Sequence, residues 1–117
     1  MRVLLIGSGA REHALARRLA SESGISDLLC VPGNPGISRI ARVAAGDPSR
    51  PDGIAALVDL ARQERIDLTV VGPEVPLSLG IVDRFTAEGR LIVGPNAIVN
   101  TFSTRKPGSV FFKSARL

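Results

Sequence analysis

The sequence predicts an α/β domain in which five parallel strands form a doubly wound sheet. Short apolar runs of strand length alternate with amphipathic stretches of helix length along the 117 residues. Strands separated by helices of this length form parallel βαβ units, and right-handed crossovers place helices on both faces of the sheet. A chain of this length makes one domain that buries roughly two-thirds of its unfolded surface.

The first half of the chain contains three predicted strands. Residues 2–6 (RVLLI) and residues 27–31 (DLLCV) are continuous apolar runs, as strands buried on both faces require. A helix is expected from about residue 12 to residue 20, because Leu15 and Leu19 share one helix face. A third strand is placed within residues 40–45.

The second half contains two further strands and two helices. Pro51 and Asp52 open a helix whose apolar residues follow the i, i+3, i+4, i+7 rule, at positions Ile54, Leu57, Val58 and Ala61. Residues 68–71 and 91–93 are the last two strands. Between them lies a helix from about residue 78 to residue 87 that buries Ile81, Val82 and Phe85.

The charge distribution and the composition argue against a nucleic-acid-binding, membrane-spanning or secreted protein. Residues 1–96 hold eleven Arg and eleven Asp or Glu, so the net charge of +4 comes from Arg105, Lys106, Lys113 and Arg116 alone. This balance is poor support for nucleic-acid binding. No apolar run reaches the ~18 residues of a membrane span, and the N-terminus lacks a signal-peptide pattern. With one cysteine, Cys30, a disulfide framework is excluded, and a cytoplasmic protein is expected.

Four turn clusters rich in Gly and Pro each follow a strand directly, at residues 7–9, 32–36, 72–73 and 94–95. In a parallel sheet the carboxyl ends of the strands meet along one edge, where open α/β sheets bind their ligands. These clusters therefore predict a binding edge. The alternative is that they are only the turns that any strand-to-helix connection needs.

The first cluster resembles the start of a dinucleotide fingerprint. In Gly7-Ser8-Gly9-Ala10-Arg11-Glu12, the third glycine of the pattern is replaced by Glu12, whose carboxylate would lie near a cofactor pyrophosphate. The second strand also ends in Val31-Pro32 instead of the acidic residue that holds a ribose. NAD binding is thus disfavoured. A phosphate at the helix N-terminus, with Arg11 beside it, and a purely structural turn remain open.

Two other side chains are candidates. His13 lies one turn into the first helix, and as a lone histidine it predicts no metal site. The structural alternative is an exposed or half-buried helix residue that pairs with Glu12 or Glu74. Glu74 follows a strand and Gly-Pro, where it suits a substrate hydroxyl or amine. A carboxylate favoured by the dipole of a following helix is equally compatible with Glu74.

Together these segments resemble a known family. The residues 7–15 (GSGAREHAL), 32–36 (PGNPG), 67–77 (DLTVVGPEVPL) and 94–95 (GP) are similar in order and spacing to the N-terminal domain of phosphoribosylamine–glycine ligases, over residues 1 to about 96. Ala10 departs from the glycine usual in the first motif. The resemblance implies a Rossmann-like (pre-ATP-grasp) domain of a cytoplasmic ATP-grasp ligase of purine biosynthesis.

The resemblance also implies an activity and a site. Glycine would be activated by ATP, with Mg²⁺ or Mn²⁺, and joined to 5-phosphoribosylamine. No catalytic residue and no metal ligand is assigned, and no cofactor is expected on this domain alone. The implied substrate-binding residues are Gly9, Arg11, Glu12, His13, Asn34, Pro35, Gly36, Gly72, Pro73, Glu74, Pro76 and Leu77.

The resemblance stops before the C-terminus. Residues 1–96 form the expected domain, and residues 97–117 are a divergent basic tail, truncated or altered relative to the family, with three of the four Phe. Because the ATP-grasp domain is missing and would act in cis or in trans, we expect this chain to be inactive alone. The alternatives are a non-catalytic module that binds phosphosugars or nucleotides, and a small dinucleotide-binding oxidoreductase domain.

Overall fold

The computed structural model describes residues 1–72 and 80–94. Five parallel strands form one sheet in the order β3-β2-β1-β4-β5. The strands are β1 (Arg2–Gly7), β2 (Asp27–Pro32), β3 (Arg42–Val43), β4 (Leu68–Val71) and β5 (Leu91–Val93). This arrangement confirms the predicted α/β class and the doubly wound sheet.

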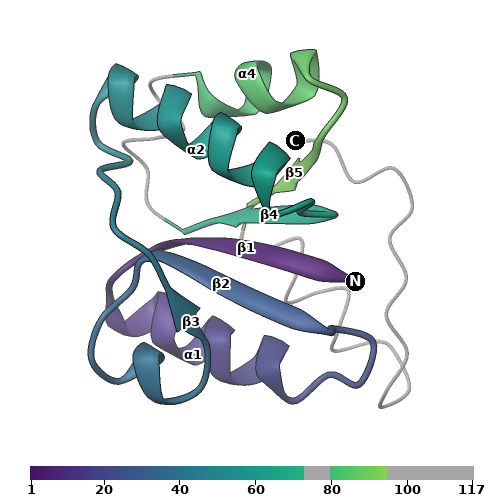
Figure 1. The fold of residues 1–117 in the computed structure, drawn as a ribbon. Helices are drawn as coiled ribbons and strands as arrows, with labels where there is room; N and C mark the ends of the chain where they lie inside the picture. The colour runs from purple at the N-terminus through teal and green to yellow at the C-terminus, as the bar shows by residue number, and fades with distance from the viewer. Residues whose placement is uncertain (73–79, 95–117) are drawn as a thin grey trace.

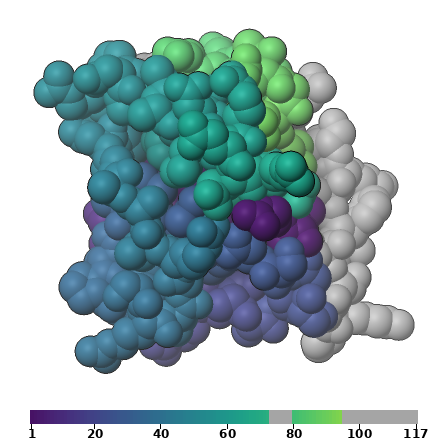
Figure 2. Space-filling view, in the orientation of Figure 1, coloured from purple at the N-terminus to yellow at the C-terminus, as the bar shows by residue number. Residues whose placement is uncertain are grey.

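The helices lie on both faces of the sheet (Figure 1). Helix α1 (Ala10–Ala20) and the short 3₁₀ helix η1 (Ile37–Arg39) are below the sheet in that view, whereas α2 (Pro51–Gln63) and α4 (Ile81–Ala87) are above it. In the space-filling view the atoms of α2 and α4 meet along the upper part of the molecule (Figure 2). None of the described helices is long and apolar enough to cross a bilayer.

Strand β1 explains why the core has two halves. Its side chains alternate, so Val3 and Leu5 pack with the residues of α1, whereas Leu4 and Ile6 pack with those of α2 and α4. All four are fully buried, and each such burial stabilises the fold by roughly 1.5–3 kcal/mol. The continuous apolar run of residues 2–6 is therefore what a central parallel strand requires.

The third strand lies within the predicted range 40–45, with two residues that are both exposed at the edge of the sheet. Two predicted helices differ in their bounds, and the first of them, α1, begins at residue 10 instead of 12. The helix expected from residue 78 begins at Ile81 after Gly80, whose positive φ suits glycine; residues 78 and 79 lie outside the described part. Ile81 and Phe85 are buried as predicted, and Val82 is half-buried. The domain boundary at residue 96 also lies outside the described residues and stays a prediction.

An ion-pair network lies where β1, β2 and β3 begin, at the opposite edge of the sheet from the glycine-rich turns. Arg42 pairs with Asp27 at 2.8 Å and with Glu64 at 2.5 Å, and Arg2 lies 3.2 Å from Asp27 and 3.4 Å from Glu64. Hydrogen bonds to Glu64 and then to Asp27 raise the pKa of Arg42. This network joins β1, β2, β3 and the end of α2, far from the glycine-rich turns.

Candidate functional site

The turns after β1 and β2 and the first residue after β4, Gly72, lie together at the carboxyl edge of the sheet. The backbone N–H of Gly33 donates to the carbonyl of Gly7 at 3.1 Å, and the N–H of Gly72 donates to the carbonyl of Ile6 at 3.0 Å. The first bond extends the β1–β2 pairing to Gly33, and the second extends the β1–β4 pairing to Gly72. Segments distant in the sequence are thereby joined, as the turn positions predict.

The glycine turn leads directly into α1. Gly9 is the N-cap, its carbonyl accepts the first helical bond from the N–H of His13 at 3.0 Å, and its own N–H donates to Glu12 Oε1 at 3.0 Å. A glutamate at the third helical position commonly caps the N-terminus in this way. This bond accounts for the earlier helix start, because it fixes Gly9 as the N-cap.

The side chain of Glu12 fills the space between the turns of β1 and β4. A Cβ atom on Gly72 would lie 2.5 Å from Glu12 Oε2, and one on Gly7 would overlap Glu12 Cγ. Gly7 also has φ +145°, which side chains rarely adopt. The Glu12 side chain is only 9% exposed, so both glycines are needed to make room for it.

Asn34 ties the turn after β2 to the glycine turn. Its Nδ2 donates to the carbonyl of Ser8 at 2.8 Å, and its Oδ1 accepts from the backbone N–H of Ile37 at 2.9 Å. The side-chain amide thus both bridges two loops and starts η1. Pro35 is exposed beside it, and its carbonyl accepts a 2.7 Å bond from the Ser38 hydroxyl.

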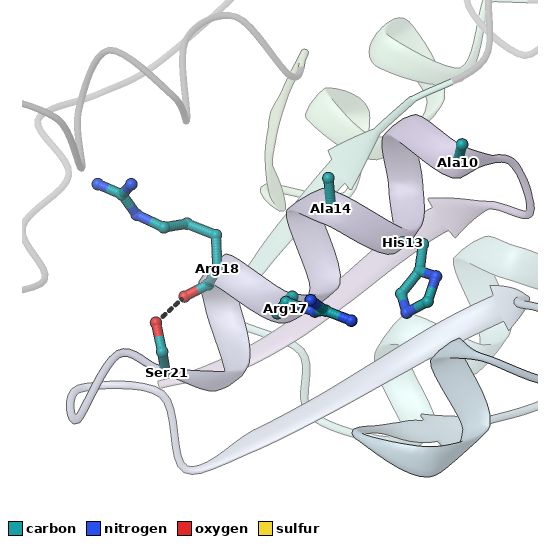
Figure 3. Close-up of a pocket in the computed structure, with 6 residues that line it drawn as sticks. All are labelled: Ala10, His13, Ala14, Arg17, Arg18 and Ser21. Atoms are coloured by element: carbon teal, nitrogen blue, oxygen red, sulfur yellow. Dashed lines mark hydrogen bonds between the residues drawn. The ribbon is translucent and has the colours of Figure 1, made fainter.

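His13 packs against the same turn through Gly36. A Cβ on Gly36 would lie 2.5 Å from His13 Cε1, so only glycine lets the half-buried imidazole approach this closely. Within the described residues His13 makes no ion pair with Glu12. The ring also lines one end of a hollow of about 620 Å³ along the outer side of α1, formed by Ala10, His13, Ala14, Arg17, Arg18 and Ser21 (Figure 3).

Arg11 is the exposed cation of the edge. Its side chain is 64% exposed, and its Nε lies 4.0 Å from Glu12 Oε2, too far for a hydrogen bond. The guanidinium therefore keeps its donors available to solvent or to an anionic ligand next to the glycine turn.

Other chemistry is limited in the described part of the chain. Cys30 lies in the core, where burial raises the pKa of its thiol to about 12. Among residues 1–72 and 80–94, no three His, Cys, Asp or Glu side chains gather as a metal ion would need. This donor set does not fit a divalent cation, and we assign none of these residues to ATP or Mg²⁺.

Eight of the twelve predicted site residues lie in the described part. Seven of them belong to the turns after β1 and β2 or to the first turn of α1, and Gly72 follows β4 at the same edge. Pro73, Glu74, Pro76 and Leu77 lie outside the described residues. Sequence reasoning missed the part of Ser8, whose carbonyl binds Asn34. A backbone acceptor leaves no signal in the sequence.

Comparison with known proteins finds relatives of this chain. The family described as phosphoribosylglycinamide synthetase, N domain, matches residues 1–101. A phosphoribosylamine–glycine ligase of Xanthomonas campestris pathovar campestris is 48% identical over 97 residues, which are 83% of this chain and 22% of that protein. The same-named ligase of Chlorobaculum tepidum is 45% identical over 106 residues, with 91% and 25% covered. That of Escherichia coli is 46% identical over 100 residues, with 83% and 22% covered. The chain thus spans about a quarter or less of the length of these relatives.

Proposed function

Because this chain belongs to the family of phosphoribosylglycinamide synthetase N domains, we propose that it is the substrate-side domain of an ATP-dependent ligase. The ligase would join glycine to 5-phosphoribosylamine in purine biosynthesis, as the names of the relatives suggest. The observation that supports the proposal is the carboxyl edge of the sheet, where the turns after β1 and β2 and Gly72, all within the family match, lie together beside the N-terminus of α1.

The proposed role of this domain is to bind and orient the phosphosugar. Arg11 offers an exposed guanidinium to the phosphate, next to the N-terminus of α1. Asn34 and His13 hold the turn of residues 33–36 against α1 and so shape the wall of the site. We propose Pro73, Glu74, Pro76 and Leu77 as further lining residues, with Glu74 accepting from a substrate hydroxyl or amine.

Chemistry would take place with a second, ATP-grasp region, supplied by the rest of a longer chain or by another chain. ATP and Mg²⁺ (or Mn²⁺) held there would supply the phosphoryl transfer: the glycine carboxylate would take the γ-phosphoryl group with release of ADP, and the amine of the phosphosugar would then displace phosphate. We propose no nucleophile or general base in residues 1–96, and we expect this chain to be inactive alone. A cytoplasmic location is also proposed, in keeping with the single, reduced Cys30.

A chimeric ligase tests the proposed function. Residues 1–96 of this chain would replace the matching segment of the Escherichia coli ligase. We expect a purified chimera that forms glycinamide ribonucleotide only when ATP, glycine and phosphoribosylamine are all present. A folded chimera that binds ATP but forms no product would instead favour the non-catalytic binding module.

A further inference from the structure

The switch point of this sheet lies between β1 and β4. From β1 the chain proceeds to β2 and β3 on one side, whereas β4 and β5 extend the sheet on the other. Ligands of doubly wound sheets bind in the crevice outside the carboxyl ends of the two strands at such a point. At this point Gly7 ends β1, and Gly72 follows β4 and donates its N–H to the carbonyl of Ile6.

Glu12 occupies the crevice. A Cβ atom on Gly7 would overlap Glu12 Cγ, and one on Gly72 would lie 2.5 Å from Glu12 Oε2, so the Glu12 side chain takes the space beside both glycines. Its Oε1 accepts the N–H of Gly9, which is one of the loop donors that a phosphate would use at a helix N-terminus. The space and a hydrogen-bond donor are both taken by the protein's own carboxylate.

We infer that Glu12 is a specificity-determining residue that stands in the place of a ligand diphosphate, so that this edge excludes nucleoside diphosphates and dinucleotides. A diphosphate at the switch point would need the volume of the Glu12 side chain and would meet its negative charge at close range in a poorly hydrated site. A sugar monophosphate held by Arg11 at the exposed rim need not enter the crevice. The inference rests on the proposed function only in taking this edge as the ligand site.

Inorganic pyrophosphate is the probe for this inference, followed through the backbone amide shifts of residues 8–10 in the full chain. Glu12→Gln keeps the shape of the side chain and removes its charge, and Glu12→Ala also empties the crevice. Glu88→Gln makes the same charge change at the exposed end of α4 and is the matched control.

We expect no pyrophosphate binding by the wild-type chain at these amides and an affinity at least tenfold higher in Glu12→Gln. Glu12→Ala should bind still more tightly if it folds, and Glu88→Gln should behave as the wild type. The inference is wrong if the wild-type chain binds pyrophosphate there as tightly as Glu12→Gln, or if the folded variants gain nothing. The wild-type arm decides alone if both variants fail to fold, because binding at residues 8–10 contradicts the inference and its absence supports it.

Glycinamide ribonucleotide added to the same samples separates this inference from the proposed function. Ribonucleotide binding without any pyrophosphate gain in the Glu12 variants would refute the inference alone. A pyrophosphate gain without ribonucleotide binding would refute the proposed function and leave the assignment of Glu12 in place.

Discussion

Glu12 and Gly72 form a close contact that requires a glycine at position 72. The carboxylate is nearly buried, accepts the Gly9 N–H, and reaches the turn of β4 only because Gly72 has no side chain. A residue pair of this kind couples α1 to a strand that follows it by some fifty positions in the sequence. The position of α1 relative to the turn after β1 and to Gly72 therefore depends on this contact.

The Gly72→Ala substitution tests this contact. Its methyl group would lie 2.5 Å from Glu12 Oε2, so we expect the free energy of unfolding to fall by about 1–3 kcal/mol, as for other overpacked sites. Urea denaturation measures the change. In a Glu12→Ala background the same methyl group should cost at least ~1 kcal/mol less, because the conflicting atoms are gone. Equal costs in both backgrounds would show that the two residues are not coupled.

Among the described residues, we expect the Arg11 side chain to contribute most to the affinity for the phosphosugar. Its guanidinium is exposed, so Arg11→Ala should leave the unfolding free energy within about 0.5 kcal/mol of the wild type. A lost charge-assisted bond would weaken binding of glycinamide ribonucleotide by roughly tenfold or more. Arg17→Ala, on the exposed side of the same helix, is the control for net charge. An unchanged affinity in Arg11→Ala would remove this residue from the site.

At the scale of elements, the turn after β2 is held in place by side chains and not by the sheet ladder alone. Asn34 joins the turn after β2 to the glycine turn after β1 through its side-chain amide. The His13 ring packs closely against Gly36. Val43 of the edge strand lies beneath Gly33 in the same way, since a Cβ there would be 2.6 Å from Val43 Cγ1. The wall of the site therefore depends on β1, α1 and β3 together.

Asn34→Asp separates the two bonds of this side chain. The carboxylate keeps an acceptor for the Ile37 N–H but has no donor for the Ser8 carbonyl, so the bridge between the loops is lost. We expect a loss of about 1 kcal/mol in stability and faster amide exchange at residues 8–10. Ser38→Ala, which removes a bond within the same segment, should leave that exchange unchanged.

The sequence pattern predicted the elements well, because β1, β2 and β4 are buried on both faces and α2 is amphipathic. It predicted the start of α1 two residues late, since apolar periodicity does not register a cap made by Glu12 on a backbone N–H. It placed Glu12 near a ligand but could not show that its side chain turns inward between two glycines. Such contacts arise between distant segments and need the fold itself.

At the scale of the whole molecule, the labelling rate of the Cys30 thiol measures how often the core opens. Its thiol is fully buried and the pKa is raised to about 12, so the folded state resists both access and ionisation. We expect thiol labelling of the native chain at pH 8 to be slower than in denaturant by a factor comparable to the unfolding equilibrium constant. Rapid labelling without denaturant would contradict a closed core.

The raised pKa of the Cys30 thiol determines how the stability of the fold changes with pH in the alkaline range. An unfolded thiol ionises near pH 8.5, whereas the folded one holds its proton to about pH 12. The thiol therefore contributes stability that is complete below pH 8.5 and is lost as the pH rises toward 12. A Cys30→Ala variant should show less of this alkaline decline in urea denaturation, and an identical decline would assign it to other groups.

The central proposal is that residues 8–13, 33–36 and 72–77 bind the phosphosugar of the ligase reaction. An amide NMR titration of the full chain with glycinamide ribonucleotide, with NADH as the control ligand, tests it most directly. The account predicts shifts confined to these segments with the ribonucleotide and none with NADH. Shifts with NADH alone would contradict it in favour of a dinucleotide-binding domain, and no shifts with either ligand would show that this chain does not bind the phosphosugar by itself.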